Sequence, residues 1–266
     1  MINNAIEADR RPIRGHAPGR HSRPGKTQFL VLNCALVGLL SSFSAISAFY
    51  QQPPASSEQE SGQAMPAEKT FAEDVKFLSE HVDTIVLRGD SGASQVAVVP
   101  AYQGRVMTST ATGDNGTSFG WINYEQVAEG MDADAQINVF GGEERFWLGP
   151  EGGQFSIFFR PGAKFEFSNW QTPPLIDTEP FDIVEQDDAR VQFQKEASLK
   201  NYSGSSLQFR IGRNVELLSD AAAARSLNVE LEGIQFVGYQ TTNRLTNTGK
   251  ADWKKENGLL SIWLLG

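Results

Sequence analysis

Residues 140–159 hold the residue types of this chain that could most readily form a polar binding site. Arg145 and Trp147 are two residues apart, so on a strand they would share one face, and Glu151 follows shortly before a pair of glycines. An aromatic plane packs against the CH face of a sugar ring, and planar charged groups form paired hydrogen bonds with neighbouring hydroxyls. The spacing predicts a sugar-binding corner made by Arg145, Trp147 and Glu151.

A structural interpretation of the same stretch remains open. Arg145 and Glu151 could form an ion pair that locks the turn, while the glycine pairs at 141–142 and 152–153 supply turns with positive φ. A phosphate-binding loop is not indicated, because the glycines lack the spacing and the Lys-Ser/Thr pair of a P-loop.

Trp170 and Asn243 are two further candidates for ligand binding. Trp170 precedes a Thr-Pro-Pro sequence and would either stand at the rim of the site or anchor a loop in the core. Asn243 lies inside a predicted strand, where it faces the ligand or a neighbouring strand. The acidic run at 182–188 lacks EF-hand spacing, so we expect a solvated turn there and no metal site.

The scarcity of histidine and cysteine limits the catalytic and metal sites that the chain can form. Beyond residue 50 the chain has one histidine, His81, and no cysteine. Zinc sites built on these residues, Ser-His-Asp nucleophiles and Cys-His nucleophiles are therefore excluded. Catalysis would depend on carboxylates, arginine, tyrosine or lysine, and we expect no cofactor.

The charge is divided unevenly along the 266 residues. Residues 1–28 are basic, residues 29–50 carry no charge, and the remainder has 17 basic against 30 acidic side chains. Nucleic acid is not an expected partner, because neutralisation of phosphates supplies most of that affinity.

The first fifty residues have the pattern of a targeting segment. A basic leader, the uncharged run 29–50 and small residues near its end predict a signal peptide or a signal anchor over residues 1–50. The run is long enough to span a bilayer, so membrane contact is expected only through 29–50, and only if it stays uncleaved. Either alternative places the body outside the cytoplasm, periplasmic or secreted. Residues 51–69, rich in Pro, Ser and Gln, are predicted to be a disordered linker.

The remaining residues, 70–266, read as one β-rich domain. Thr70 and Glu73 form a capping-box signature before a helix over 71–81. Period-two patterns separated by turn residues predict strands at 84–88, 95–99, 105–110, 118–122, 136–140, 154–159, 181–185, 190–194, 207–217, 233–247 and 259–264. Residues 217–227 would form a short helix or a loop. Many strands with one short N-terminal helix predict an all-β, antiparallel sandwich.

The stretch 141–159, followed by 169–182, resembles an uncharacterised family of exported bacterial proteins. Its core, Gly-Gly-x-x-Arg-x-Trp-x-x-Pro-Glu, is similar to that of domains with the galactose mutarotase-like supersandwich, and residues 243–249 and 253–266 resemble central strands of that fold. The resemblance implies two large twisted antiparallel sheets, with a ligand groove on a concave face. It also assigns Arg145, Trp147 and Glu151 to the motif.

The C-terminal residues 259–266 read as a buried strand. Either this strand closes a sheet, or the domain is incomplete at the C-terminus; we favour the second, since members of the resembled family continue past a Trp-Leu-Leu-Gly element. Sugar epimerases of that superfamily use a histidine acid and a glutamate base, and this chain has no histidine after His81.

These observations predict a domain of unknown function that interacts with a saccharide, without assigned catalysis. One alternative is a sugar-active enzyme, epimerase- or lyase-like, that uses Glu151 as its general base. A second alternative is a purely structural envelope protein.

Overall fold

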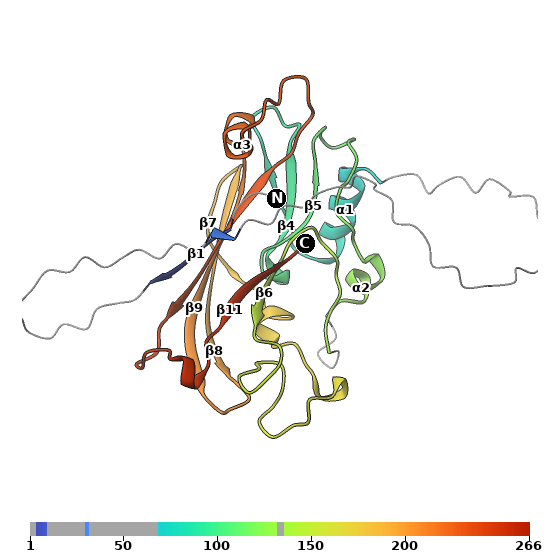
Figure 1. Cartoon of the computed structure of the whole chain (residues 1–266). Helices are drawn as coiled ribbons and strands as arrows, with labels where there is room; N and C mark the ends of the chain where they lie inside the picture. The colour runs from blue at the N-terminus through green and yellow to red at the C-terminus, as the bar shows by residue number, and fades with distance from the viewer. Residues whose placement is uncertain (1–3, 10–29, 32–68, 132–135) are drawn as a thin grey trace, which may run out of the picture.

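The structure is a computed structural model that describes residues 4–9, 30–31, 69–131 and 136–266 (Figure 1). For residues 4–9 and 30–31 it describes the backbone alone. The predicted targeting segment and linker thus lie almost wholly outside the described residues. Within the described ranges, no helix has the length and apolar character needed to cross a membrane.

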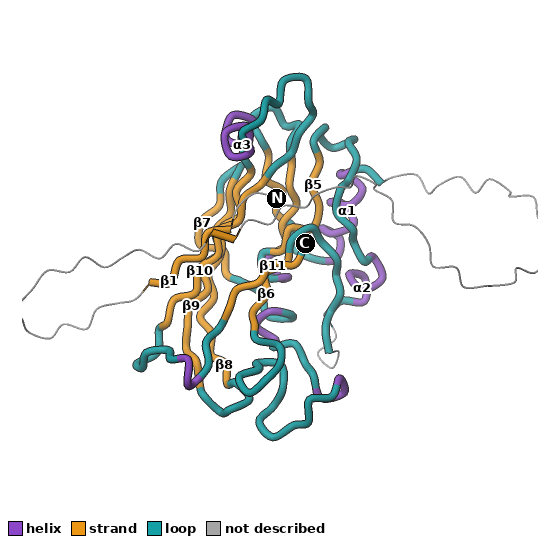
Figure 2. Tube along the Cα trace, in the orientation of Figure 1, coloured by secondary structure: helices purple, strands orange, loops and turns teal. Residues whose placement is uncertain are grey.

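Strands make up most of the regular structure (Figure 2). They are β1 (Asn4–Asp9), β2 (Leu30–Val31), β3 (Ile85–Arg88), β4 (Gln95–Val99), β5 (Arg105–Thr110), β6 (Arg145–Gly149), β7 (Asp182–Gln186), β8 (Arg190–Lys200), β9 (Ser206–Leu217), β10 (Tyr239–Asn247) and β11 (Ser261–Leu265). The helices are α1 (Phe71–His81), α2 (Tyr124–Glu129) and α3 (Asp220–Leu227), with short 3₁₀ turns η1 (Pro100–Tyr102), η2 (Phe167–Asn169), η3 (Pro174–Ile176) and η4 (Lys255–Asn257).

Helix α1 has the predicted bounds and the predicted cap. The side chain of Thr70 accepts from the backbone N–H of Glu73, and Glu73 Oε2 accepts from the backbone N–H of Thr70 at 2.8 Å. This reciprocal pair satisfies two N–H groups that a helix start leaves without partners. Phe71 and Leu78 then turn one apolar side to the core.

The strands form three sheets in the orders β2-β1-β10-β9-β8-β7, β11-β6 and β3-β4-β5. Every pairing is antiparallel except that of β1 with β10. The prediction of an all-β, mainly antiparallel domain is confirmed at this level.

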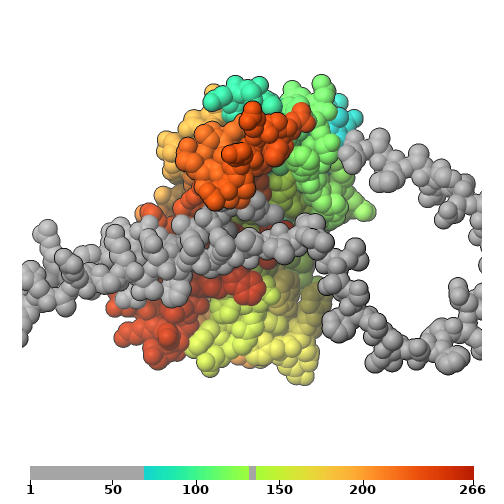
Figure 3. Space-filling view, turned by 45° about the horizontal axis from the view of Figure 1, so that its top comes forward, coloured from blue at the N-terminus to red at the C-terminus, as the bar shows by residue number. Residues whose placement is uncertain are grey.

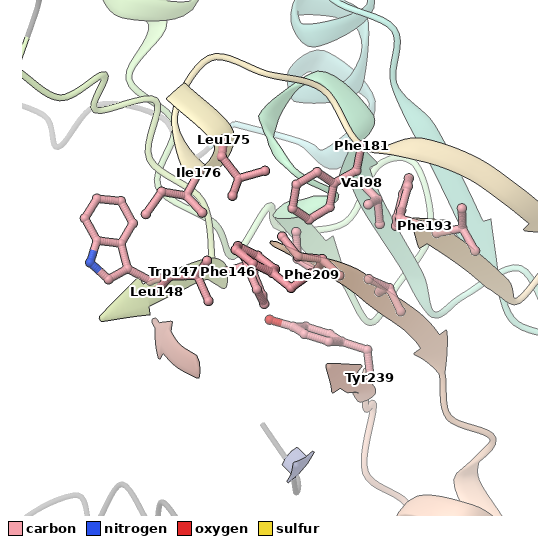
Figure 4. Close-up of a cluster of buried hydrophobic side chains, with 14 of the residues drawn as sticks. Val98, Phe146, Trp147, Leu148, Leu175, Ile176, Phe181, Phe193, Phe209 and Tyr239 are labelled. Carbon is pink, nitrogen blue, oxygen red and sulfur yellow. The ribbon is translucent and has the colours of Figure 1, made fainter. Parts of the chain in front are cut away.

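Two apolar clusters show that the elements pack in layers. In the larger cluster, side chains of β3–β5 and β6 meet those of β8, β9 and β10, and Figure 4 shows Phe146, Phe193 and Phe209 packed there, with the Tyr239 ring entering from β10. In the smaller cluster, α1 and α2 cover the other side of β3–β5. Strand β4 is buried along its whole length, because both of its faces are covered.

Different segments of the chain form the two ends of the molecule. In the space-filling view, residues around 110–125 and 220–238 gather at one end, and residues around 150–175 lie with the C-terminal residues at the other (Figure 3).

Three segments predicted as strands fold as loops: 118–122, 136–140 and 154–159. The first is held by isolated contacts, among them a single bridge from Ile122 to Gly141. Gly120 lets this loop lie against β5, since a Cβ there would stand 2.0 Å from the carbonyl oxygen of Met107. The apolar pattern at 154–159 reflects burial and not strand pairing, whereas Phe119 and Trp121 of 118–122 are exposed.

In 154–159, turn hydrogen bonds replace a ladder. The backbone N–H of Ser156 donates to the carbonyl of Gly153 at 3.0 Å, and that of Ile157 donates to Pro150 at 3.1 Å. Ile157 and Phe158 are buried all the same. Apolar alternation alone does not distinguish such a buried loop from a strand.

Candidate functional site

Strand β6 and the turn after it connect the three motif residues Arg145, Trp147 and Glu151. The guanidinium carbon of Arg145 lies 4.3 Å from the centroid of the Trp147 ring, because residues two apart on a strand share a face. The indole Nε1 of Trp147 donates a 2.7 Å hydrogen bond to Oε1 of Glu151. The structure therefore brings the three side chains together.

The alternative of an ion pair between Arg145 and Glu151 is wrong. Arg145 pairs with Asp177 at 2.8 Å and donates to the carbonyl of Ile176 at 3.0 Å. Asp177 also accepts from the Nδ2 of Asn138 at 2.7 Å. The partner lies 32 residues along the chain, where η3 returns to β6.

Trp147 is buried, contrary to the exposed aromatic plane expected of a sugar platform. Its exposed fraction is 1%, and Phe158 packs against its ring at a centroid distance of 5.5 Å. Burial of an indole usually requires a partner for its N–H, and Glu151 is that partner. In this structure the ring stabilises the core and does not face solvent.

Trp170 and Asn243 occupy different surroundings. Trp170 is half-buried and stacks with Phe158 and Phe167, which fits both of its predicted roles, rim and anchor. Asn243 is buried on β10 directly opposite Arg213 on β9, and its Oδ1 accepts from Arg213 at 2.8 Å. Asn243 thus faces a cross-strand neighbour.

Arg213 connects the large sheet to the start of β6. Its Nη1 donates to Oε1 of Glu144 at 3.0 Å, and its Nε donates to the carbonyl of Gly104 at 3.0 Å. The guanidinium is buried, yet its Nη2 has no hydrogen-bond partner among the described residues. A polar group thus sits on the inner face of a sheet whose other inward residues on β9 are apolar.

Glu143, beside this buried pair, is half-buried and points elsewhere. Its carboxylate accepts from the hydroxyl of Ser109 at 2.8 and 3.1 Å. The backbone N–H of Glu143 donates to the carbonyl of Val106, and the positive φ of Gly142 permits that turn. We call Glu143, Ser109 and the nearby Tyr239 the Glu143 corner.

The surroundings of the Glu143 corner favour the protonated forms of the Glu143 carboxyl group and the Tyr239 hydroxyl group. Burial raises the pKa of Glu143, and the hydrogen bond from Ser109 together with the nearby Tyr239 hydroxyl only partly offsets this effect. The pKa of Tyr239 is raised as well, first by burial and then by Glu143 and Glu144. The Tyr239 hydroxyl makes no well-formed hydrogen bond within the described part of the chain.

Two exposed aromatic residues border the Glu143 corner. Phe119 is 56% exposed and Trp121 is 62% exposed. The backbone N–H of Phe119 donates to the carbonyl of Ser109 at 3.0 Å, and the carbonyl of Trp121 accepts from Gly142 at 2.7 Å. We call Phe119 and Trp121 the aromatic shelf. Its backbone is hydrogen-bonded to Ser109 and to Gly142, the residue before Glu143.

Arg105, at the start of β5, is a buried cation without an ion pair in the described ranges. Its exposed fraction is 1%, its Nη1 donates to the carbonyl of Gly141 at 2.9 Å, and its Nε and Nη2 have no partner there. Burial lowers its pKa well below the ordinary value, and the nearby Arg145 adds to this. The guanidinium lies under Gly141, and the next residue, Gly142, donates to the carbonyl of Trp121 on the aromatic shelf.

Among the described residues, no group of three or more His, Cys, Asp and Glu could hold a metal ion. In the acidic run 182–188, Arg190 pairs with Glu185 at 2.6 Å and with Asp187 at 3.5 Å.

The sequence reasoning missed the aromatic shelf and the Glu143 corner. Trp121 falls in the predicted strand 118–122, and Glu143 is not among the candidate ligand-binding residues. A signal was present, since the Phe-Gly-Trp of 119–121 places two large apolar residues around a glycine. Only the fold reveals that the two segments meet.

Comparisons with known proteins identify a family and no activity. The model of a family of unknown function (DUF6786) matches residues 69–266. No curated protein matches the chain. A solved structure, that of the Slr1438 protein from Synechocystis sp. PCC 6803, has 16% identity and a TM-score of 0.28 over 51% of this chain. The match covers 48% of the solved chain, about half its length, and so low a similarity establishes neither fold nor function.

Proposed function

Since this chain belongs to the family of unknown function DUF6786 through residues 69–266, its role must be inferred from its own geometry, and we propose that it binds a saccharide at the Glu143 corner. The aromatic shelf of Phe119 and Trp121 would receive the CH face of a sugar ring. Glu143, which is half-buried, would bond its hydroxyls. We further propose that the domain acts outside the cytoplasm, as the targeting pattern of residues 1–50 suggests.

The single observation that carries the proposal is the exposed Trp121, whose carbonyl accepts from Gly142, the residue before half-buried Glu143. Large aromatic residues at a surface with a polar group at hand suit ligands that have one apolar and one hydroxylated side. The Ser109 hydroxyl fixes the Glu143 carboxylate, which reduces the entropy lost when a ligand is bound. This pairing favours a saccharide over an apolar ligand.

The fold supports the same proposal at a coarser level. Antiparallel sheets meet over one core, and Arg213, Asn243 and Tyr239 form a polar patch on the inner side of β9 and β10. We propose that the sheets belong to a galactose mutarotase-like supersandwich, as the resemblance of the Arg145–Glu151 motif implies. The buried motif residues would then shape the site from behind.

A second candidate is a sugar-active enzyme, and one observation favours it. A carboxylic acid whose pKa is raised by burial retains its proton closer to neutral pH, as a general acid must. Glu143 meets this condition beside an exposed shelf. Glu151, the earlier candidate base, is engaged by the indole of Trp147.

Affinity electrophoresis on soluble polysaccharides, followed by calorimetry with the best ligand, tests the proposal. We expect Trp121→Ala to weaken binding by about tenfold or more, which corresponds to about 1.4 kcal/mol. The matched control is Ile234→Ala, which removes another residue that is 60% exposed. Equal retention of every polysaccharide by wild type and Trp121→Ala would exclude this site.

A further inference from the structure

A second exposed aromatic platform lies on η2, apart from the aromatic shelf. Phe167 is 71% exposed, the largest exposed fraction among the bulky apolar residues described. Trp170 stacks with Phe167 at a centroid distance of 6.1 Å and an angle of 16°, and with buried Phe158 at 5.2 Å and 15°. Three nearly parallel rings therefore run from the core to the surface and present the flat ring of Phe167 outside.

The chain holds this platform in place through its backbone. The N–H of Trp170 donates to the carbonyl of Phe167 at 3.1 Å. The side chain of Gln136 donates to the same carbonyl at 3.0 Å. Two hydrogen bonds hold the backbone of Phe167, and the three-ring stack holds its side chain. The ring is therefore pre-oriented, so little entropy is lost when a flat partner packs on it.

One short segment joins this platform to the Glu143 corner. Gln136 contacts Phe167, and four residues later Phe140 accepts from the N–H of Asn123 at 3.0 Å, next to Trp121. The backbone of these five residues spans at most about 18 Å. The segments that hold the two platforms lie toward different ends of the molecule (Figure 3), so only a long ligand could reach both. Val139, in the middle of the segment, is itself 46% exposed, so the path between the two platforms is partly apolar.

We infer that Phe167 is a second sugar-stacking subsite and that the ligand is an extended glycan, not a monosaccharide. The inference depends on the proposed function, because it assigns the outer platform to the same molecule that the Glu143 corner binds. One chain across two platforms gains affinity once it is long enough to reach both. The strongly acidic body makes a polyanionic partner unfavourable, so the glycan expected is neutral.

The surroundings of Phe167 support a hydrated ligand. Lys164 and Glu166 flank the aromatic residues of the loop, and their side chains are 82% and 60% exposed. Asn169, also exposed, donates to the carbonyl of Lys164 at 3.1 Å. An apolar plane ringed by polar groups matches a sugar ring, which has an apolar face and a polar rim.

Calorimetry with neutral β-linked gluco-oligosaccharides, from the monosaccharide to the octasaccharide, tests the inference. In the wild type we expect affinity to rise with length and then level off once both platforms are reached. We expect Phe167→Ala to lose roughly tenfold or more for the longest members and nothing for the shortest. Val184→Ala, which removes an exposed residue on β7, is the matched control.

The outcomes separate the two proposals. Affinity that does not change with length, or a Phe167→Ala variant that binds the octasaccharide as wild type does, overturns the second subsite while short sugars still bind at Trp121. If Phe167→Ala changes only the sedimentation coefficient, the ring docks a second copy of the chain and the inference is wrong. If Trp121→Ala binds every sugar as tightly as wild type does, the proposed function itself is contradicted.

Discussion

The indole Nε1 of Trp147 donates a 2.7 Å hydrogen bond to Oε1 of Glu151, and the same indole carries the guanidinium of Arg145 on its ring. The most conspicuous motif of the sequence thus forms a closed unit in which Arg145 and Trp147 are buried and Glu151 is half-buried. It positions β6 and the turn after it, and the side chains that we propose for ligand binding lie at Glu143 and on the aromatic shelf.

Removing the ring of Trp147 should damage the fold before it affects any ligand. Trp147→Ala leaves a cavity in the core and leaves Glu151 without its donor, so we expect a loss of about 3–5 kcal/mol in the free energy of unfolding. Urea titration followed by circular dichroism measures this loss. A variant with the melting curve of the wild type would show that the indole is not part of the core.

The ion pair of Arg145 with Asp177 is expected to be worth far more than a surface pair. Asp177→Asn keeps the shape but leaves a buried guanidinium without its counter-charge, at a cost of about 3–5 kcal/mol. The exposed pair of Lys76 and Glu80 gives a matched control, since Glu80→Gln should change stability by less than about 0.5 kcal/mol. Similar losses in both variants would contradict the burial of the first pair.

Replacing Arg105, unlike replacing Asp177, is not expected to destabilise the fold. Its guanidinium is buried and has no ion pair among the described residues, so its desolvation cost is offset only in part, by the bond to the carbonyl of Gly141 and by the rings of Tyr102 and Phe140. Arg105→Met retains the length of the side chain and should leave stability unchanged or raise it by about 1 kcal/mol. A clear loss of stability would mean that the charge is paired in solution.

The raised pKa of Glu143 makes stability depend on pH in a definite direction. The folded state holds the proton more tightly than the unfolded chain, so this contribution is complete below the ordinary pKa of 4.5 and is lost as the pH rises through the raised pKa. Glu143→Gln should remove that part of the slope. Unfolding titrations of both proteins from below pH 4.5 to neutrality measure the difference, and identical slopes would contradict the raised pKa.

Local signals were enough to predict helix α1 and most of the long strands. The Thr70–Glu73 cap lies within four residues, and the alternation along β9 persists over twelve. The partner of Arg145 could not be predicted, because Asp177 lies 32 residues away and no local rule connects them. The Trp121 loop was missed for a similar reason, since its contact with Gly141 requires the fold.

The most direct measurement is an NMR titration of the tryptophan indole N–H signals with the glycan that binds best. We expect the signal of Trp121, assigned by its loss in Trp121→Phe, to shift with ligand concentration, while the signal of buried Trp147 stays in place. A titration that leaves Trp121 unchanged while glycan binds would contradict a binding site on the aromatic shelf beside Glu143.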